Sequence, residues 1–319
     1  MRAIQYHEHG GPVVLTTADV DVPEPEPNAV RIAAHAAAVN PVDTYFREGT
    51  YETAGLPRIP GSDVAGVVDA VGEDVEGLEE GDRVFGTALG RDVQGTCAEF
   101  VVAPEDRLAI LPDAVDFDVG AAAALVGVTA WRALLDHARL RPADRCLIHG
   151  GSGGVGHVAV QLAAATGAHV TATAAPSTHD RLAELGADRT LDYDRADLET
   201  AIVEGGAPDV VLDHRLDDYF QLDADVAAHG ARIVGIGENS KAAGFSNVGL
   251  ARSKELSVHL MSMFNTPDVS AVLSRLATLL EAGELTAHVA RTYPLEDVAD
   301  AQRAVMDERF VGKLVVEIR

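Results

Sequence analysis

The chain has 319 residues, 47% of them hydrophobic, so it is long enough for about two domains and too apolar to be disordered. Its 50 acidic residues outnumber its 25 basic ones, and the formal net charge of −25 disfavours nucleic acid and anionic lipid as partners. No apolar run approaches the roughly 20 residues that span a bilayer, so membrane insertion is not expected.

The acidic residues are spread along the chain, and the basic residues are mostly arginine, with Lys241, Lys254 and Lys313 as the only lysines. Such a surface is typical of a protein that stays soluble in concentrated salt, where charge repulsion is screened. We therefore expect a halophile's protein; the alternative is an acidic surface in a mesophile. A predicted strand begins almost at Met1 with no signal peptide before it, so the expected location is the cytoplasm.

The chain up to about residue 120 is rich in proline, glycine and short β-forming runs. Strands are expected at residues 30–32, 64–71, 82–85 and 97–102, with glycines between them. Prolines at 23, 25 and 27 predict an extended loop, because each fixes its backbone and removes a donor. This part therefore predicts a β-rich, barrel-like domain.

Beyond residue 120, predicted strands alternate with predicted helices, which indicates a doubly wound parallel sheet in an α/β fold. Helices are expected at residues 120–135, 155–166 and 177–185, and strands at 145–149, 169–174, 208–213, 231–236 and 256–261. Two helices, 267–282 and 295–307, precede a last strand, 313–318. We expect this tail to rejoin the first domain, giving a discontinuous domain (1–122 and 265–319) around a second one (123–264).

A glycine cluster follows the expected strand at 145–149 and opens a helix; it reads Gly151, Ser152, Gly153, Gly154, Val155, Gly156. Glycines there let the backbone turn tightly and approach a pyrophosphate, and the helix offers free N–H groups to the phosphates. The context of strand, turn and helix predicts a dinucleotide site. The alternative is a turn made only for packing.

The end of the second strand distinguishes NAD from NADP, because an NAD site usually has an acidic residue there for the ribose 2′-hydroxyl. Residues 171–176 contain no acid, and polar residues that can donate to a phosphate follow. NADPH is therefore the favoured cofactor, with Ser177 and Tyr193 as candidate contacts. Arg181 is only a possibility, since a single arginine more often lies on a solvated helix face.

Several segments resemble one family closely: residues 40–51, 60–68, 81–85, 129–134, 149–156, 293–296 and 312–316. The chain resembles the zinc-free, zeta-crystallin-like quinone oxidoreductases of the medium-chain dehydrogenase/reductase superfamily over nearly its whole length. The resemblance implies a Rossmann domain and a discontinuous GroES-like catalytic domain. Relatives commonly join the sheets of two subunits edge to edge, so the resemblance also implies a homodimer. We expect the two copies to pair through the apolar strand at 256–261.

Zinc-dependent relatives carry a Cys where this chain has Asn40, and a His-Glu pair where it has Ser62 and Asp63. Asn and Ser are poor zinc ligands. The two cysteines, Cys97 and Cys146, cannot form a four-thiolate site either. We therefore expect no metal.

The resemblance implies that the catalytic pocket is lined by Asn40, Tyr45 and Tyr51. Asn40 would hold the nicotinamide or an acceptor oxygen, and the tyrosines would stack on the acceptor or donate to it. The alternative is that both tyrosines are half-buried packing residues. Asp43 is interpreted as a cap rather than an acid catalyst.

For the cofactor, the resemblance implies contacts from the glycine loop and from further positions: Thr129, Tyr193, Gly235, Ile236, Gly237, Glu238, Met263, Phe264 and Asn265. The chain departs from the family pattern at His214, where relatives often have a glycine-bearing turn. Thr178 stands where many relatives have a lysine for the 2′-phosphate. His214 can serve the cofactor, but a lone histidine is more often structural.

These features predict an NADPH-dependent quinone oxidoreductase that transfers hydride in the interdomain cleft without metal. An alternative is reduction of an activated carbon–carbon double bond in an enone or enoyl thioester. A coenzyme A thioester would need a basic patch, for which Arg47, Arg58 and Arg91 are candidates. A non-enzymatic NADP-binding protein is a third hypothesis.

Overall fold

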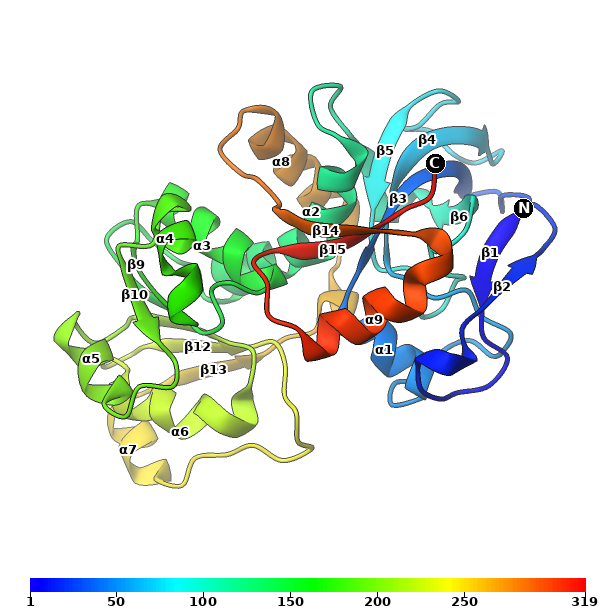
Figure 1. Ribbon diagram of the computed structural model, residues 1–319. Coiled ribbons are helices and arrows are strands. Elements are labelled where there is room, and N and C mark those ends of the chain that lie inside the picture. Colours follow the sequence, from blue (N-terminus) through cyan, green and yellow to red (C-terminus); the bar gives the residue numbers. More distant parts are fainter. The chain divides into compact units, whose positions relative to one another are not determined.

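The computed structural model describes residues 1–319 and divides the chain into two compact units (Figure 1). Unit 1 comprises Met1–Val128 and Pro267–Arg319, and unit 2 comprises Thr129–Thr266. The first break between the units lies within helix α2 (Phe117–Trp131), between Val128 and Thr129.

Unit 1 is built on a seven-stranded sheet of order β14-β15-β3-β4-β5-β7, with β6 paired to β3. Its strands are β3 (Ala29–Val39), β4 (Asp63–Val71), β5 (Arg83–Gly86), β6 (Phe100–Pro104), β7 (Leu108–Ile110), β14 (Val289–Pro294) and β15 (Lys313–Glu317). A separate two-stranded sheet joins β1 (Arg2–Gln5) and β2 (Thr16–Asp19). Strand β15 pairs with β3, so the C-terminal tail is an integral part of unit 1.

The helices of unit 1 alternate with these strands along the sequence. They are α1 (Pro41–Glu48), the first part of α2, α8 (Val269–Glu281), α9 (Val298–Asp307), and three 3₁₀ turns at Pro12–Val14, Glu105–Arg107 and Leu295–Asp297. The core joins residues distant in sequence, since Val30 and Ile32 of β3 are fully buried together with Leu314 and Val316 of β15. This shared core explains why the tail is needed to complete the unit.

Unit 2 is a six-stranded parallel sheet of order β10-β9-β8-β11-β12-β13. Its strands are β8 (Arg145–Ile148), β9 (His169–Ala174), β10 (Arg189–Asp192), β11 (Val210–Asp213), β12 (Arg232–Gly235) and β13 (Ser257–Leu260). Its helices are the π-helix η3 (Arg132–His137), α3 (Gly154–Thr166), α4 (His179–Glu184), α5 (Leu198–Glu204), α6 (Leu216–Val226), α7 (Val248–Ser253), and 3₁₀ turns at Pro176–Thr178 and Met263–Asn265. The strand order reverses between β8 and β11, which is where such sheets bind ligands at their carboxyl ends.

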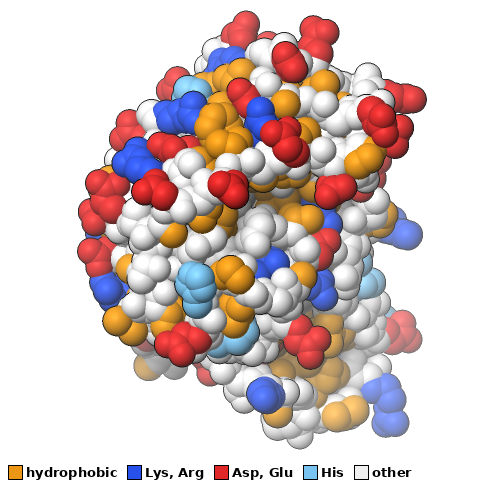
Figure 2. Space-filling view, turned by 90° about the vertical axis from the view of Figure 1, so that its right-hand side faces the viewer, with side chains coloured by type: hydrophobic (Ala, Val, Ile, Leu, Met, Phe, Trp, Pro, Cys, Tyr) orange, Lys and Arg blue, Asp and Glu red, His pale blue; other side chains and the backbone are white.

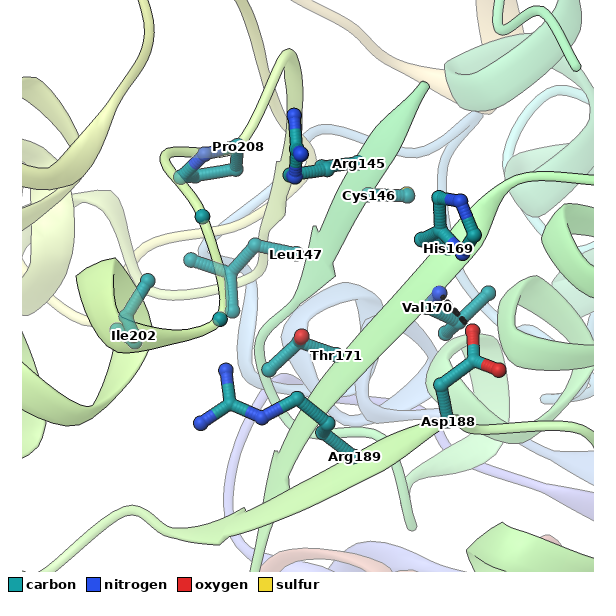
Figure 3. Close-up of a pocket in the computed structure, with 12 residues that line it drawn as sticks. Arg145, Cys146, Leu147, His169, Val170, Thr171, Asp188, Arg189, Ile202 and Pro208 are labelled. Atoms are coloured by element: carbon teal, nitrogen blue, oxygen red, sulfur yellow. Dashed lines mark hydrogen bonds between the residues drawn. The ribbon is translucent and has the colours of Figure 1, made fainter. Parts of the chain in front are cut away.

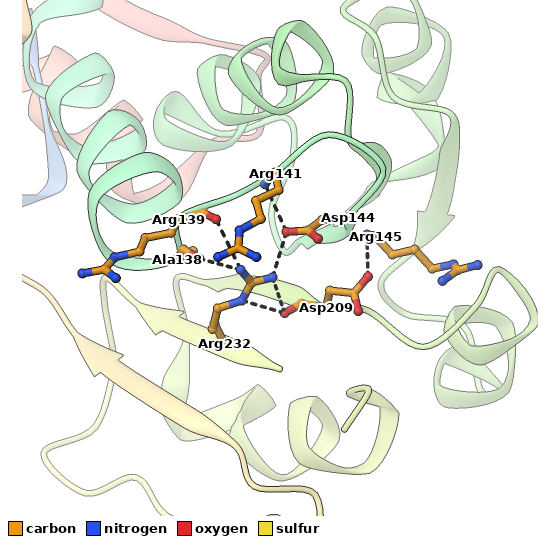
Figure 4. Close-up of polar contacts among 7 residues, drawn as sticks. All are labelled: Ala138, Arg139, Arg141, Asp144, Arg145, Asp209 and Arg232. Atoms are coloured by element: carbon orange, nitrogen blue, oxygen red, sulfur yellow. Dashed lines mark hydrogen bonds and ion pairs between the residues drawn. The ribbon is translucent and has the colours of Figure 1, made fainter. Parts of the chain in front are cut away.

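The amino edge of this sheet is tied to the end of η3 by Arg232 (Figure 4). Its guanidinium donates hydrogen bonds to the carbonyls of Ala138 (3.0 Å) and Arg139 (3.3 Å) and to the carboxylate of Asp144 (2.8 Å). Last-turn carbonyls of a helix have no partner within it. Arg232 therefore closes this helix end and fixes it to β12.

One continuous helical segment, Phe117–His137, is long and apolar enough to cross a membrane. Its most apolar 18-residue window is 78% buried within the protein, and the core helix of a soluble protein passes the same test of length and composition. The segment is therefore weak support for a membrane span. On the surface, acidic side chains are scattered over the face in Figure 2 and are not gathered in one patch.

Candidate functional site

The glycine cluster, residues 151–156, begins in the loop that connects β8 to α3 and continues into the first turn of α3; we call it the glycine loop. The Gly151 N–H donates to the Thr173 carbonyl (2.8 Å), which ties the loop to the end of β9. A Cβ on Gly156 would lie 2.1 Å from the Gly150 carbonyl oxygen, and one on Gly151 would lie 2.8 Å from the Ala172 Cβ. Both positions therefore need glycine, because a side chain would collide with the loop backbone at Gly156 and with strand β9 at Gly151.

The amino end of α3 has Gly153 at its N-cap, and no side chain caps it. The first-turn N–H groups of a helix lack partners within it and lie at the positive end of the helix dipole. A bare, glycine-lined helix start is a ready anion site. This cradle, which a side chain would fill, fits the pyrophosphate of a dinucleotide.

Most of the predicted cofactor residues lie in loops that follow strands of unit 2. Ser177 follows β9, Tyr193 follows β10, Gly235 ends β12 and is followed by Ile236 to Glu238, and Met263 to Asn265 follow β13. Carboxyl ends of parallel strands lie at one edge of a sheet. The structure thus brings these residues to the same edge as the glycine loop, whereas Thr129 lies within α2.

The end of β9 carries no acidic side chain, and neither does the 3₁₀ turn Pro176–Thr178 that follows it. Ser177 is exposed there. Arg181 on α4 is paired with Glu184 (2.8 Å), with both side chains largely exposed. Arg181 therefore belongs to a solvated helix face, which is the alternative considered from the sequence.

In unit 1, Asn40 lies at the start of α1 and is almost completely buried. Its backbone N–H donates to Asp43 Oδ2 (2.8 Å), and its Nδ2 donates to Asp63 Oδ2 (2.8 Å). Its Oδ1 accepts from Lys313 Nζ, while Ser62 Oγ donates to the other Asp43 oxygen (2.6 Å). Both ends of the Asn40 amide are thus held by charged neighbours. The interpretation of Asp43 as a cap is confirmed.

Burial governs the electrostatics of this network. It raises the pKa of Asp43 to about 6, raises that of Asp63 and lowers that of Lys313. Lys313 Nζ lies 3.8 Å from Asp63 Oδ2, and Asp63 also accepts from the Leu125 N–H (3.0 Å). Lys313 was missed as a site residue from the sequence; its signals there were that it is one of three lysines and lies in the segment 312–316, which resembles the family.

Across residues 1–319, no group of three or more His, Cys, Asp or Glu side chains could hold a metal ion. Both cysteines are free and buried. The positions at which zinc-dependent relatives have ligands belong here to the Asn40 network. Asn40 as a direct contact of nicotinamide or acceptor stays a prediction.

The helix α1 and the residues after it bring the two candidate tyrosines together. The rings of Tyr45 and Tyr51 meet edge to face, with centroids 5.5 Å apart. Gly49 ends α1 in a left-handed conformation (φ 76°), and the Thr50 N–H donates back to the Tyr45 carbonyl (2.9 Å). Tyr51 is 42% exposed. The turn therefore presents an aromatic pair with one solvent-accessible member.

Two of the three arginines considered for a basic patch are unsuitable for that role. Arg47 and Arg58 are 1% and 2% exposed. Arg47 donates to the Gly10 carbonyl (2.9 Å), and Arg58 donates to the carbonyls of Ala54 (3.0 Å) and Gly90 (2.9 Å). The expectation of a patch from these side chains is wrong, because they hold loops from inside the unit.

A cavity of about 290 Å³ lies at the amino ends of β8, β9 and β10, away from the glycine loop (Figure 3). Arg145, Thr171 and Arg189 line it. Arg189 donates to the Ala201 carbonyl (2.9 Å) in the last turn of α5. A basic side chain there provides a hydrogen-bond donor for a carbonyl that has no partner within the helix. This cavity is therefore separate from the candidate cofactor edge.

Comparison with known proteins agrees with this geometry. An alcohol dehydrogenase GroES-like domain family matches residues 26–113, and a zinc-binding dehydrogenase family matches residues 185–316. A quinone oxidoreductase of Lama guanicoe is 37% identical over 330 residues, covering 100% of this chain and 98% of its own. The chain belongs to the quinone oxidoreductase family of the medium-chain dehydrogenase/reductase superfamily.

Solved structures of this superfamily are similar along the whole chain. Escherichia coli quinone oxidoreductase complexed with NADPH has a TM-score of 0.91 at 28% identity, with 100% of each chain covered. An NAD-dependent alcohol dehydrogenase has a TM-score of 0.92 at 33% identity, again with 100% of each chain covered. The protein is therefore an NAD(P)-dependent oxidoreductase with a GroES-like domain, unit 1, and a Rossmann domain, unit 2.

Proposed function

We propose that the protein is an NADPH-dependent quinone oxidoreductase that works without metal. The observation that carries this proposal is the Asn40 network. Where zinc-dependent relatives have ligands, an amide here is bound to Asp63 and Lys313. A quinone suits such a site, because its conjugated oxygens take up charge without a Lewis acid. Relatives named quinone oxidoreductases support this substrate class.

The geometry of each domain supports the following assignment of roles. Bound NADPH supplies the hydride. The glycine loop and the start of α3 hold the pyrophosphate, and Ser177 and Tyr193 contact the adenosine phosphate. The bonds to Asp63 and Lys313 fix the orientation of Asn40, which we assign to the nicotinamide or acceptor, and we assign Tyr45 and Tyr51 to the acceptor ring.

The experiment is a steady-state assay in high salt with NADPH and NADH against a panel of quinones and enones. We expect NADPH to bind more tightly, because the end of β9 lacks a carboxylate, and quinones to be the better acceptors. Equal or tighter NADH binding contradicts the cofactor assignment, and turnover of enones alone contradicts the substrate. Elemental analysis should find no stoichiometric zinc, and a chelator should leave turnover unchanged.

The aromatic pair is tested by substituting Tyr51. If its hydroxyl donates to the developing oxyanion, Tyr51→Phe should lose about 1–3 kcal/mol of transition-state stabilisation, with cofactor affinity unchanged. If the ring only stacks, Tyr51→Phe should be silent and Tyr51→Ala should lose turnover. No effect in either variant would remove Tyr51 from the site.

We also propose a cytoplasmic homodimer. Strand β13 is an edge of the unit 2 sheet, and Val258 and Leu260 are 36% and 71% exposed on it. An exposed edge with apolar side chains is a liability that pairing with a second copy removes. Light scattering in high salt should report twice the chain mass; a monomer would contradict the proposal.

A further inference from the structure

A buried polar cluster lies next to the glycine loop. His149 separates β8 from Gly150 and is 2% exposed. Its Nε2 lies 2.9 Å from Asp223 Oδ1, and its Nδ1 lies 3.2 Å from Thr173 Oγ1. The residues come from β9, α6 and the end of β8, so the cluster joins three elements behind the loop.

The donor and the acceptor of each hydrogen bond in this cluster can be assigned. Burial lowers the pKa of His149 to about 4, so its ring is neutral and carries one N–H. A carboxylate oxygen at Asp223 accepts that N–H from Nε2, which leaves Nδ1 to accept from the Thr173 hydroxyl. Thr173 Oγ1 in turn accepts the N–H of Gly150 (3.2 Å), the residue that opens the loop.

A second buried carboxyl group, that of Asp213, lies near Asp223. Asp213 ends β11, and its Oδ1 accepts from the Arg215 N–H (2.7 Å). The Oδ2 atoms of Asp213 and Asp223 are both buried, and no N–H or O–H of another residue donates to either. The two carboxyl groups are close enough for Asp223 to repel the charged form of Asp213, and one proton held between the two donorless oxygens would satisfy both. Burial raises the pKa of both groups, and their mutual repulsion raises that of Asp213 further.

No buried cation neutralises this pair. Tyr219 stacks on the His149 ring with centroids 4.4 Å apart. The other charged or titratable groups around the cluster are His214, Arg215, Asp218 and Tyr193. Arg215 is ion-paired with Asp218 at the surface, and His214 is exposed, with its ring against Gly150. The shared proton is therefore what keeps the pair at a single negative charge.

We propose that His149 is a positioning residue of the dinucleotide site, and that the proton shared by Asp213 and Asp223 sets how tightly the glycine loop holds the cofactor. Gly150 has a left-handed backbone (φ 66°), and the Thr173 hydroxyl fixes its amide. Loss of the proton adds a second negative charge at the carboxyl edge that receives the pyrophosphate. The inference rests on the part of the proposed function that concerns dinucleotide binding. It does not depend on which substrate accepts the hydride.

The test is the pH dependence of cofactor affinity, measured by fluorescence with NADPH and NADH from about pH 6 to about pH 9, a range that spans the raised carboxyl pKa values. The wild type should lose about tenfold in affinity as pH rises, which corresponds to a cofactor-induced pKa change of about one unit. Asp223→Asn should bind with nearly constant affinity. Asp225→Asn, on the same helix but bound to Gln221, should behave as the wild type.

A wild-type affinity that does not change with pH overturns the proposal, as does an Asp223→Asn variant with the full pH dependence. NADH serves as the control for titration of the NADPH 2′-phosphate, because NADH lacks that group. Only an effect common to both cofactors counts in favour.

A second measurement applies even if Asp223→Asn does not fold. ¹⁵N NMR of His149 should find the proton on Nε2 and none on Nδ1 at neutral pH. Thr173→Val should weaken cofactor binding about fivefold, the value of one lost hydrogen bond, and Thr173→Ser should restore it. A proton on Nδ1, or unchanged binding in Thr173→Val, overturns the role of His149.

Discussion

Two buried clusters of carboxyl groups, one in each domain, are neutralised in different ways. In unit 1, Asp63 is balanced by Lys313, which lies 3.8 Å away. In unit 2, Asp213 and Asp223 have only each other and a neutral His149. A fixed cation keeps its partner charged over a broad pH range, whereas a shared proton is lost as pH rises. The difference predicts that the Asp63–Lys313 contact persists over a broad pH range, whereas the proposed proton-sharing pair in unit 2 makes cofactor binding depend on pH.

The largest expected effect comes from the charges on the protein surface and not from either buried cluster. Dilution into low salt should unfold the protein or abolish activity, because the net charge of −25 repels itself when the Debye length grows from about 3 Å at 1 M to about 30 Å at 0.01 M. Circular dichroism and activity against salt concentration measure this, and added salt should reverse it. A chain that stays folded and active in dilute buffer would contradict the halophilic interpretation.

Removing the cation should have the next largest effect. Lys313→Met leaves Asp63 buried without its partner, and breaking such a pair costs about 3–5 kcal/mol. Denaturant unfolding in high salt measures the free energy of unfolding. The loss should be similar at two high salt concentrations, since a buried pair is screened little.

Lys241 provides the matched control, because it is exposed and Lys241→Met makes the same chemical change. It should alter the free energy of unfolding by less than about 0.5 kcal/mol. Adding Asp63→Asn to Lys313→Met should recover part of the loss, as expected for coupled neighbours. Equal losses from both lysine variants would show that unit 1 does not depend on its cation.

The smallest effect concerns the proton-sharing pair. Its native pKa values are raised, so between the unfolded value of about 4 and the native values the folded state binds more protons, and stability falls as pH rises. The slope reaches about 1.4 kcal/mol per pH unit for each extra proton. Asp223→Asn should flatten it above about pH 7, where His149 is neutral in both states and contributes nothing.

Unfolding free energies measured from about pH 7 to about pH 9 provide the comparison, a range chosen because unfolded carboxyl groups are already ionised there. Asp225→Asn should keep the wild-type slope, since its carboxyl group is half-buried and bound to Gln221. Identical slopes in all three proteins would remove the distinction between the two clusters.

Local features of the fold and site were predictable from the sequence. The glycine loop and the strand before it lie within a few residues of one another, and glycine there has a steric reason, as the 2.1 Å approach at Gly156 shows. The alternation of strands and helices likewise predicted the parallel sheet of unit 2, because each parallel strand needs a crossover connection. The cap formed by Asp43 also depends on residues three positions apart.

Features that depend on distant residues were not predictable. Asp223 reaches His149 from 74 positions away, and its partner Asp213 looked like an ordinary strand end. Arg47 and Arg58 looked like loop residues suited to a basic patch, yet loops fold around them. No period or motif in the sequence encodes these burials, because they arise only when separate elements pack.

The position of Lys313 has a consequence for how the chain is made. It binds Asn40 across 273 positions, so the ribosome has synthesised all the residues before Lys313 when this cation emerges. Until then unit 1 lacks strand β15, through which β14 joins the sheet, and Asp63 has no counter-charge, whereas unit 2 is one contiguous segment. Domains generally fold as units during synthesis, with those nearer the N-terminus first. Here the middle of the chain is expected to fold before its beginning.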